Sequence, residues 1–297
     1  MDPAWAVSDI SCTPAPLGLE ELAFHPTWEE GDVHQLERVG EVSESERPTL
    51  GALSRVTLSV SEVTSDGVVL TWSEGVPNLL FDAAEPTVRE YLAELDPLRY
   101  DYRINALREY EGAIDITQIR DWLSDAAALA TAFGLDLELS GFEQVMAMTD
   151  EDLESLWTQE PANFHRLDGM TVAVGEEKAG EGSIVSLHTS SEVSAQTTLR
   201  IVDLVDEDGC ITVELVSRPD QAGLFDIVSE YLAFLGIERS EDEIREDLER
   251  FAVENRYIGQ WDYLEHRFIR VVRVDYFSNG GGERTQTVTY TDVTPEG

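Results

Sequence analysis

The five histidines of this chain are the side chains best suited to hold a metal or to move protons near neutral pH. They are His25, His34, His165, His188 and His266, and none has the spacing of a metal site such as His-Glu-x-x-His. We therefore interpret them as ordinary packed or surface residues. No residue is assigned to a metal.

Acidic residues are so frequent that their pairing says little about acid–base catalysis, because 60 of the 297 residues are Asp or Glu. The most suggestive cluster is Asp206-Glu-Asp208-Gly209, which resembles part of a calcium-binding loop. However, Leu204 and Leu215 occupy positions where that loop needs oxygen ligands. A tight turn is the better interpretation of this cluster.

Motifs of common enzyme classes are missing from the sequence. The glycines at 280–282 precede neither a helix pattern nor a lysine, so they do not predict a phosphate-binding loop. The Gly-x-Ser-x-Gly elbow of hydrolases does not occur. We assign no catalytic residue, no cofactor-binding residue and no cofactor, and we expect a protein that is not an enzyme.

Aromatic side chains remain as candidates for contact with a ligand. The five considered are Trp122, Trp157, Trp261, Tyr263 and Tyr276. They either line a cavity or fill the core, and core packing is the simpler interpretation because large aromatic side chains dominate protein interiors.

The chain has two cysteines, Cys12 and Cys210. Cys210 falls in a predicted strand, and we interpret it as a buried thiol. A disulfide with Cys12 is an open alternative. The segment Ile10-Ser11-Cys12 also has some similarity to a lipoprotein attachment site, but Asp9 precedes it and an apolar h-region is missing.

Surface charge is the strongest compositional signal. The formal net charge is −40, and Lys178 is the only lysine among the 20 basic residues. This composition resembles that of proteins from salt-accumulating haloarchaea. Such a charge repels itself unless it is screened, and the Debye length falls to about 3 Å at about 1 M salt. We therefore expect a protein that folds in molar salt and loosens in dilute buffer.

The same charge argues against nucleic acids and anionic membrane surfaces as partners, because both bind to basic surfaces. The densest basic stretch, Arg267–Arg273, holds three arginines among apolar residues, has acidic residues on both sides and predicts a strand. No run of apolar residues is long enough to predict a membrane span. We expect a soluble cytoplasmic protein, with an exported, cell-surface anchored protein as the alternative.

A hairpin over residues 55–72 is the central predicted element. Apolar side chains at 56, 58 and 60 share one strand face, and Asp66-Gly67 favours a tight turn that needs φ > 0. An apolar stripe with helical spacing predicts a helix over residues 116–133, with capping-box spacing at Asp115 and Gln118 and a stop at Gly134.

Other local patterns complete the expected elements. Ser240 and Glu243 form a further capping box, and the pair Thr149 and Asp152 marks the start of a short helix. A second such pair, at Ser140 and Glu143, predicts another short helix. Residues 43–51 are polar and contain a proline, so we expect a loop there.

Three blocks recur in the same order and predict an internal duplication. The paired blocks are residues 31–43 and 182–194, the Asp-Gly turns at 66–67 and 208–209, and residues 80–95 and 224–235. One difference stands out. After the turn, the first copy alternates on even positions from 68 to 72, whereas the second alternates on odd positions from 211 to 215. Either one copy contains a bulge or both faces of the strand are covered.

The order of elements predicts an α+β fold with two related units of curved antiparallel β-sheet covered by helices. We expect an irregular lead-in at 1–23, a first repeat with extra helices at 24–160 and a second repeat at 161–297. The Trp28-x-x-Gly31-Asp32 entry to a long strand, followed by the Asp-Gly hairpin, resembles lipoprotein-type domains similar to LolA-like carriers. That resemblance covers about 24–134 and 165–291, and it implies an apolar groove and no catalytic residues.

The function predicted from these observations is that of a non-enzymatic binding module. An apolar small ligand or a protein partner would be held by a concave sheet face. The alternative is a structural or interaction protein with no ligand pocket, and an enzyme of an unrecognised class ranks last. An apolar cavity of several hundred Å³ between sheet and helices would separate the first two.

Overall fold

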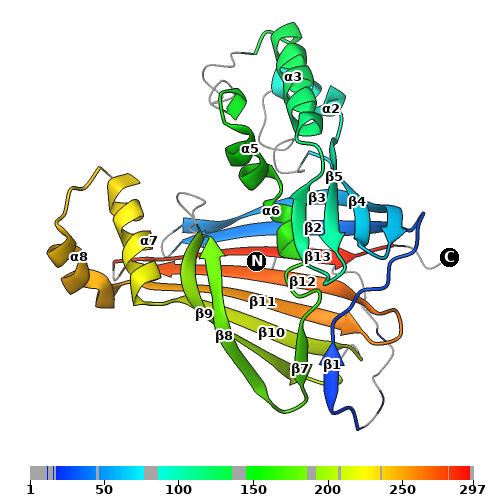
Figure 1. Cartoon of the computed structure of the whole chain (residues 1–297). Helices are drawn as coiled ribbons and strands as arrows, with labels where there is room; N and C mark the ends of the chain where they lie inside the picture. The colour runs from blue at the N-terminus through cyan, green and yellow to red at the C-terminus, as the bar shows by residue number, and fades with distance from the viewer. Residues whose placement is uncertain are drawn as a thin grey trace. The chain divides into compact units, whose positions relative to one another are not determined.

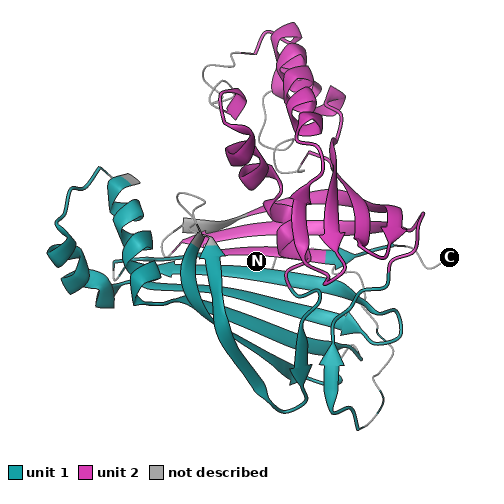
Figure 2. Cartoon of the chain, viewed as in Figure 1, with its two compact units in different colours: residues 1–27, 167–285, 291–297 teal, residues 28–166, 286–290 magenta. Residues whose placement is uncertain are grey.

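A computed structural model of the chain describes residues 12, 16, 18–44, 47–76, 86–135, 145–185, 192–206, 209–234, 236–279 and 281–294. The chain divides into two compact units (Figure 2). Unit 1 comprises residues 1–27, 167–285 and 291–297, and unit 2 comprises residues 28–166 and 286–290. Both units combine antiparallel strands with helices, so the predicted α+β class is confirmed (Figure 1).

Unit 2 is built on one run of strands in the spatial order β6-β5-β4-β3-β2-β13, and the pairs from β6 to β2 are antiparallel. Helix α3 packs on strand β5. The strands are β2 (Val33–Glu44), β3 (Arg47–Thr64), β4 (Gly67–Glu74), β5 (Leu98–Asn105), β6 (Tyr110–Ala113) and residues 286–290 of β13 (Glu283–Asp292). The described helices are α2 (Pro86–Glu94), α3 (Thr117–Ala132), α5 (Asp150–Trp157) and α6 (Gln159–Phe164).

Unit 1 contains the antiparallel run β12-β11-β10-β9-β8, and a separate pair of short strands, β1 and β7. Helix α7 packs on β9 and β10. The strands are β1 (Glu21–Ala23), β7 (Thr171–Ala173), β8 (Glu177–Val185), β9 (Glu192–Asp203), β10 (Ile211–Pro219), β11 (Ala252–Asp262) and β12 (Arg267–Ser278). The described helices are α7 (Gln221–Phe234), α8 (Glu241–Asp247) and the 3₁₀ turn η1 (Leu248–Arg250).

The predicted hairpin over 55–72 is confirmed as strands β3 and β4. Val56, Leu58 and Val60 lie on the inner face of β3 and are at most 3% exposed. Alternate side chains of a strand point to opposite faces, so this spacing buries one face of the hairpin. The hairpin therefore supplies much of the core of unit 2.

The turn of this hairpin is placed one residue earlier than predicted. Thr64 pairs with Gly67, so residues 65 and 66 form the turn. Gly67 has φ of 145°, and a Cβ there would lie 2.2 Å from the carbonyl oxygen of Ile104 in β5. The glycine is thus required by its close approach to the neighbouring strand as well as by its backbone conformation.

A bulge does not explain the register difference between the two Asp-Gly hairpins, because each copy contains one. An extra residue, Ser61, interrupts the pairing of β3 with β4, and an extra residue, Val202, interrupts the pairing of β9 with β10. The alternative, a strand covered on both faces, agrees with the structure, since Thr71 in β4 and Glu214 in β10 are buried as well as the apolar residues beside them. The segments β2–β5 and β8–β11 each place a helix between their third and fourth strands. The duplication remains a prediction, as does the domain division drawn from it.

Helix α3 confirms the apolar stripe but not the capping box. Ile119, Leu123, Ala126 and Ala130 are buried, and Gly134 follows the helix with φ of 70°. The side chain of Gln118 does not return to the helix start, because its Oε1 accepts a hydrogen bond from the backbone N–H of Asp101 in β5 at 2.7 Å. A tertiary contact has replaced the expected local one.

The remaining local predictions have mixed outcomes. Ser240 and Glu243 form the predicted capping box at the start of α8, and Thr149 caps α5 by accepting from the N–H of Asp152. The pair at 140 and 143 lies outside the described residues. The loop predicted at 43–51 is wrong, since β2 and β3 continue to a close pair at Glu44 and Arg47. Ladder hydrogen bonds of the long hairpin override the polar local sequence.

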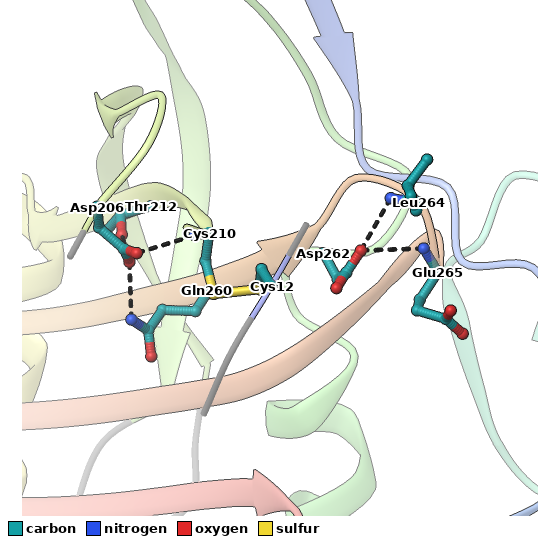
Figure 3. Close-up of a disulfide and its surroundings, with 8 residues drawn as sticks. All are labelled: Cys12, Asp206, Cys210, Thr212, Gln260, Asp262, Leu264 and Glu265. Carbon is teal, nitrogen blue, oxygen red and sulfur yellow. Dashed lines mark hydrogen bonds between the residues drawn. A yellow bond between two sulfur atoms is a disulfide. The ribbon is translucent and has the colours of Figure 1, made fainter. Parts of the chain in front are cut away.

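The two cysteines form a disulfide in unit 1 (Figure 3). Cys210 is buried as predicted, but its interpretation as a thiol is wrong, and the alternative of a bridge to Cys12 is the correct one. The carboxylate of Asp206 accepts hydrogen bonds from the N–H of Cys210 at 2.9 Å and from Nε2 of Gln260 at 2.8 Å (Figure 3). Asp206 thus closes the turn beside the disulfide.

Candidate functional site

A cavity of about 440 Å³ in unit 2 is the best candidate for a binding site. It lies where helices α2, α3, α5 and α6 meet strands β2, β4 and β5. Most of the side chains that line it are apolar, and a smaller set is charged. The apolar ones are Trp72, Val76, Leu92, Leu95, Leu98, Trp122, Leu156 and Trp157, and the charged ones are Arg38, Glu74, Asp96 and Glu160.

Three tryptophans form the aromatic part of the cavity wall. The rings of Trp122 and Trp157 meet edge to face, with centroids 5.6 Å apart. Trp72 is 1% exposed and packs against Tyr290. Rings held in this way offer a large, rigid apolar surface to a ligand.

Hydrogen bonds fix the helices that carry two of these rings. The indole N–H of Trp122 in α3 donates to the carbonyl oxygen of Asp96 at 2.8 Å. The hydroxyl of Tyr100 in β5 donates to the carbonyl oxygen of Trp157 at 3.0 Å. An ion pair of 2.6 Å between Arg120 and Asp150 joins α3 to α5. These contacts therefore join α5 to strand β5 and α3 to α5.

The charged part of the cavity is centred on Arg38 in β2. Its guanidinium donates to both oxygens of Glu160, at 3.0 Å from Nε and 2.6 Å from Nη2, and Nη1 lies 3.3 Å from Glu74. These side chains are only 15–26% exposed. A fork-to-fork pair of this kind has strict geometry and strong hydrogen bonds.

Further donors complete the network around the two carboxylates. The hydroxyl of Ser54 donates to Glu74 at 2.6 Å, and the indole N–H of Trp72 donates to the other oxygen of Glu74 at 3.3 Å. The hydroxyl of Tyr290 donates to Glu160. Each carboxylate thus accepts from at least two side chains, which offsets the loss of hydration on burial.

Two groups at this site, Arg38 and Tyr100, have pKa values above their ordinary values. Burial lowers the pKa of Arg38, but the charges of Glu160 and Glu74 outweigh it and leave that pKa above its ordinary value. The guanidinium therefore stays charged. Burial is also the main cause that raises the pKa of Tyr100 well above its ordinary value, so the hydroxyl remains a donor to Trp157.

The structure divides the five aromatic candidates of the sequence between cavity and core. Trp122 and Trp157 line the cavity, which overturns core packing as the simpler interpretation for these two. Trp261 is 1% exposed and packs against Phe24 and Phe268 in unit 1, as core packing predicts. Tyr263 and Tyr276 lie in unit 1 and do not line the cavity.

Sequence reasoning missed the charged residues of the site. Arg38, Glu74 and Glu160 are separated by 36 and 122 positions in the sequence, so no local pattern links them. Glutamates are also too frequent in this acidic chain for any one of them to indicate a binding site. The pairing of β2 with β3 and of β3 with β4 brings the first two together, and α6 adds the third.

Histidines form no metal site in the described part of the chain, where no group of three or more His, Cys, Asp or Glu side chains could hold an ion. His165 is 3% exposed, and its Nε2 lies 2.8 Å from the hydroxyl of Tyr102. This position is that of a packed residue, as predicted. His188 lies outside the described residues.

Unit 1 contains a second hollow of about 630 Å³ beside α7 and α8. Asp220, Asp226 and Glu241 contribute to its lining, and the guanidinium of Arg245 lies 4.5 Å above the ring of Phe225. Its wide opening and polar lining make it a weaker candidate for an apolar ligand than the cavity of unit 2. Within the described segments, no helix is long and apolar enough to cross a membrane.

Comparison with known proteins adds little to this geometry. No family model and no curated protein matches the chain. The chain is similar to a solved structure described as "lipid-protein interactions in lipovitellin", with a TM-score of 0.45 and 8% identity. The match covers 91% of this chain and 26% of that one, so this chain spans about a quarter of its length. Such a likeness carries no argument, and the resemblance to LolA-like carriers stays a prediction.

Proposed function

We propose that the protein is a non-enzymatic binding module that holds an apolar small ligand in the cavity of unit 2. The observation that carries this proposal is a cavity of about 440 Å³ between sheet and helices, lined mainly by leucine and tryptophan side chains. Ligand sites in proteins have volumes of about 300–1,000 Å³ and combine apolar walls with a few fixed polar groups. The cavity has both properties.

The arrangement of the polar groups supports binding rather than catalysis. Arg38, Glu74 and Glu160 are hydrogen-bonded to one another and to neighbouring side chains. A general base needs a free lone pair within reach of a substrate proton, and a nucleophile needs such a base beside it. Arg38, Glu74 and Glu160 instead form one hydrogen-bonded network in the cavity wall.

A fluorescence titration with N-phenylnaphthylamine, a neutral apolar dye, tests this function. We expect saturable binding, with one dye per chain. Leu156 is 42% exposed at the cavity, so Leu156→Trp fills space there without disturbing the core. The variant should bind the dye at least about tenfold more weakly, which corresponds to about 1.4 kcal/mol.

The matched control is Leu107→Trp, at a turn residue that is 70% exposed and does not line the cavity. It should bind the dye as the unaltered protein does. If neither the unaltered protein nor this control binds the dye, the structural or interaction protein without a ligand becomes the better account.

The disulfide bears on the compartment. Disulfides persist in oxidising surroundings and are rare where thiols are kept reduced. The bond between Cys12 and Cys210 therefore supports the exported, cell-surface alternative over the cytoplasmic expectation. Alkylation of intact cells with a membrane-impermeant reagent, after reduction, would label these cysteines in an exported protein and leave them unlabelled in a cytoplasmic one.

A further inference from the structure

We propose that the cavity of unit 2 selects apolar ligands whose head group is an organic cation, such as a quaternary ammonium. This proposal rests on the proposed function and names the class of its ligand. Two independent features of the cavity lead to it: the sign of its net charge and the tryptophans in its wall, whose N–H groups are engaged or buried.

The charged side chains that line the cavity are predominantly acidic. Arg38 contributes one positive charge, and Glu74, Asp96 and Glu160 contribute three negative charges, so the formal sum is 1 − 3 = −2. The low exposure of Arg38, Glu74 and Glu160 means that salt screens them less than surface charges. A ligand with a negative head group would meet like charge there, which disfavours binding.

Arg38 does not offer an alternative site for an anion. Its guanidinium already makes a bidentate pair with Glu160, and its remaining terminal nitrogen faces Glu74. An anionic head group would have to displace one of these carboxylates and leave it buried without its partner. The loss of a partner from a buried pair is strongly unfavourable.

The tryptophans that line the cavity have no N–H group available to a ligand. Trp122 donates its N–H to the carbonyl of Asp96, and Trp72 donates its N–H to Glu74. The Nε1 atom of Trp157 is itself buried, so it is not open to the cavity. A cation is attracted to the negative face of an indole within about 6 Å of its centre, and tryptophan is the best of the aromatic residues for this.

Carboxylates and indole rings that line one cavity are complementary to the same ligand chemistry. A quaternary ammonium has no hydrogen-bond donor, which suits a cavity in which Glu74 and Glu160 already accept from protein donors. Its alkyl chain would pack against the leucine side chains of α2, β5 and α5. Charge and aromatic surface together would hold the head group.

Three ligands with the same ten-carbon chain test the proposal by displacement of N-phenylnaphthylamine. They are decyltrimethylammonium, decanoate and decanol, each used below its aggregation concentration in about 1 M KCl, where the Debye length is about 3 Å. The ammonium should displace the dye at concentrations about tenfold lower than decanoate, consistent with one desolvated cation–π contact. Decanol should fall between them.

Two variants locate the selectivity. Asp96→Asn removes one carboxylate at the cavity, and Trp157→Leu removes one ring, so both should weaken the ammonium several-fold and leave decanol within about twofold. Asp125→Asn, on an exposed position of α3 outside the cavity lining, is the control and should change none of the three affinities.

The outcomes separate the two proposals. Equal displacement by ammonium and decanoate, or stronger displacement by decanoate, overturns the cationic selectivity and leaves the apolar binding site in place. Failure of the dye and of all three ligands to bind overturns the proposed function itself. If Asp125→Asn reduces the preference for the ammonium as much as Asp96→Asn does, the preference comes from general surface charge. The proposal would then be wrong.

Discussion

Arg38 and Glu160 meet through two parallel hydrogen bonds, at 3.0 Å and 2.6 Å, although 122 residues separate them in the chain. One belongs to strand β2 and the other to helix α6, so their pairing holds a helix against the sheet of unit 2. Both residues of this pair also line the candidate cavity. The pair that holds α6 against the sheet is therefore also part of the proposed binding site.

Arg38→Met should lower the free energy of unfolding by about 2 kcal/mol. The substitution leaves Glu74 and Glu160 close together without their cation, and partial exposure reduces the loss below the full value for a buried pair. Urea unfolding followed by circular dichroism measures this. Arg250→Met, at an arginine that is 72% exposed, should change the free energy by less than about 1 kcal/mol. Equal effects of the two variants would contradict the role given to Arg38.

Reduction of the disulfide should destabilise unit 1. The bond joins cysteines 198 positions apart, and closure of so long a loop restricts the unfolded chain by about 5 kcal/mol in the loop-entropy account. Denaturant midpoints with and without reductant, and for the double variant Cys12→Ser and Cys210→Ser, measure this contribution. Two thiols that react with an alkylating reagent in the unfolded, unreduced protein would show that the bond is absent.

Salt should control the stability of the whole chain. With a net charge of −40, self-repulsion acts against the folded state until counterions screen it. We expect the melting temperature and the circular dichroism of the fold to be retained near 1 M KCl, with a Debye length of about 3 Å, and to fall in dilute buffer. A melting temperature that is the same at low and high salt would remove the case for adaptation to brine.

The start of helix α8 should respond to acid. The backbone N–H of Ser240, followed by its hydroxyl, holds the pKa of Glu243 below its ordinary value. Because the folded pKa is depressed, this capping contribution is present above the unfolded pKa and is lost as pH falls through the folded pKa. A carboxyl titration by NMR should place Glu243 below the ordinary glutamate range. Ser240→Ala removes the hydroxyl but keeps the backbone N–H, so the pKa of Glu243 should rise only part of the way toward that range, and a value unaffected by the substitution would contradict the role of the hydroxyl.

Local sequence patterns predicted those elements that local physics controls. The β3–β4 hairpin follows from strict alternation of apolar residues, and helix α3 follows from its buried stripe of Ile119, Leu123, Ala126 and Ala130. The capping box at the start of α8 depends only on Ser240 and Glu243, which are close together in the sequence. In each of these cases the side chains that make the structure are neighbours in the sequence.

Long-range contacts explain the failures. The predicted loop at 43–51 is strand because the ladder between β2 and β3 extends to the pair of Glu44 and Arg47. Gln118 leaves its helix end for the backbone of Asp101. The cavity depends on residues from four helices and three strands, whose meeting no local pattern encodes. The sequence does not decide whether the two cysteines are bonded, because spacing in sequence does not give distance in space.

The duplication is open to a geometric test within the chain. The segments β2–β5 and β8–β11 share their order of strands and helix, and each carries a bulge before its hairpin turn. Superposition of residues 31–76 on 177–219, by matched strands, should align Ser61 with Val202. Failure to align these two bulges would argue against a common origin.

Photo-crosslinking with a neutral aliphatic diazirine, followed by peptide mapping, tests the central claim most directly because it reports where an apolar molecule resides. The account predicts that labels concentrate on residues 92–98 and 156–157 of unit 2, and that Leu156→Trp removes them while Leu107→Trp does not. Labels spread evenly over the surface, or concentrated in unit 1, would contradict the assignment of the cavity as the binding site.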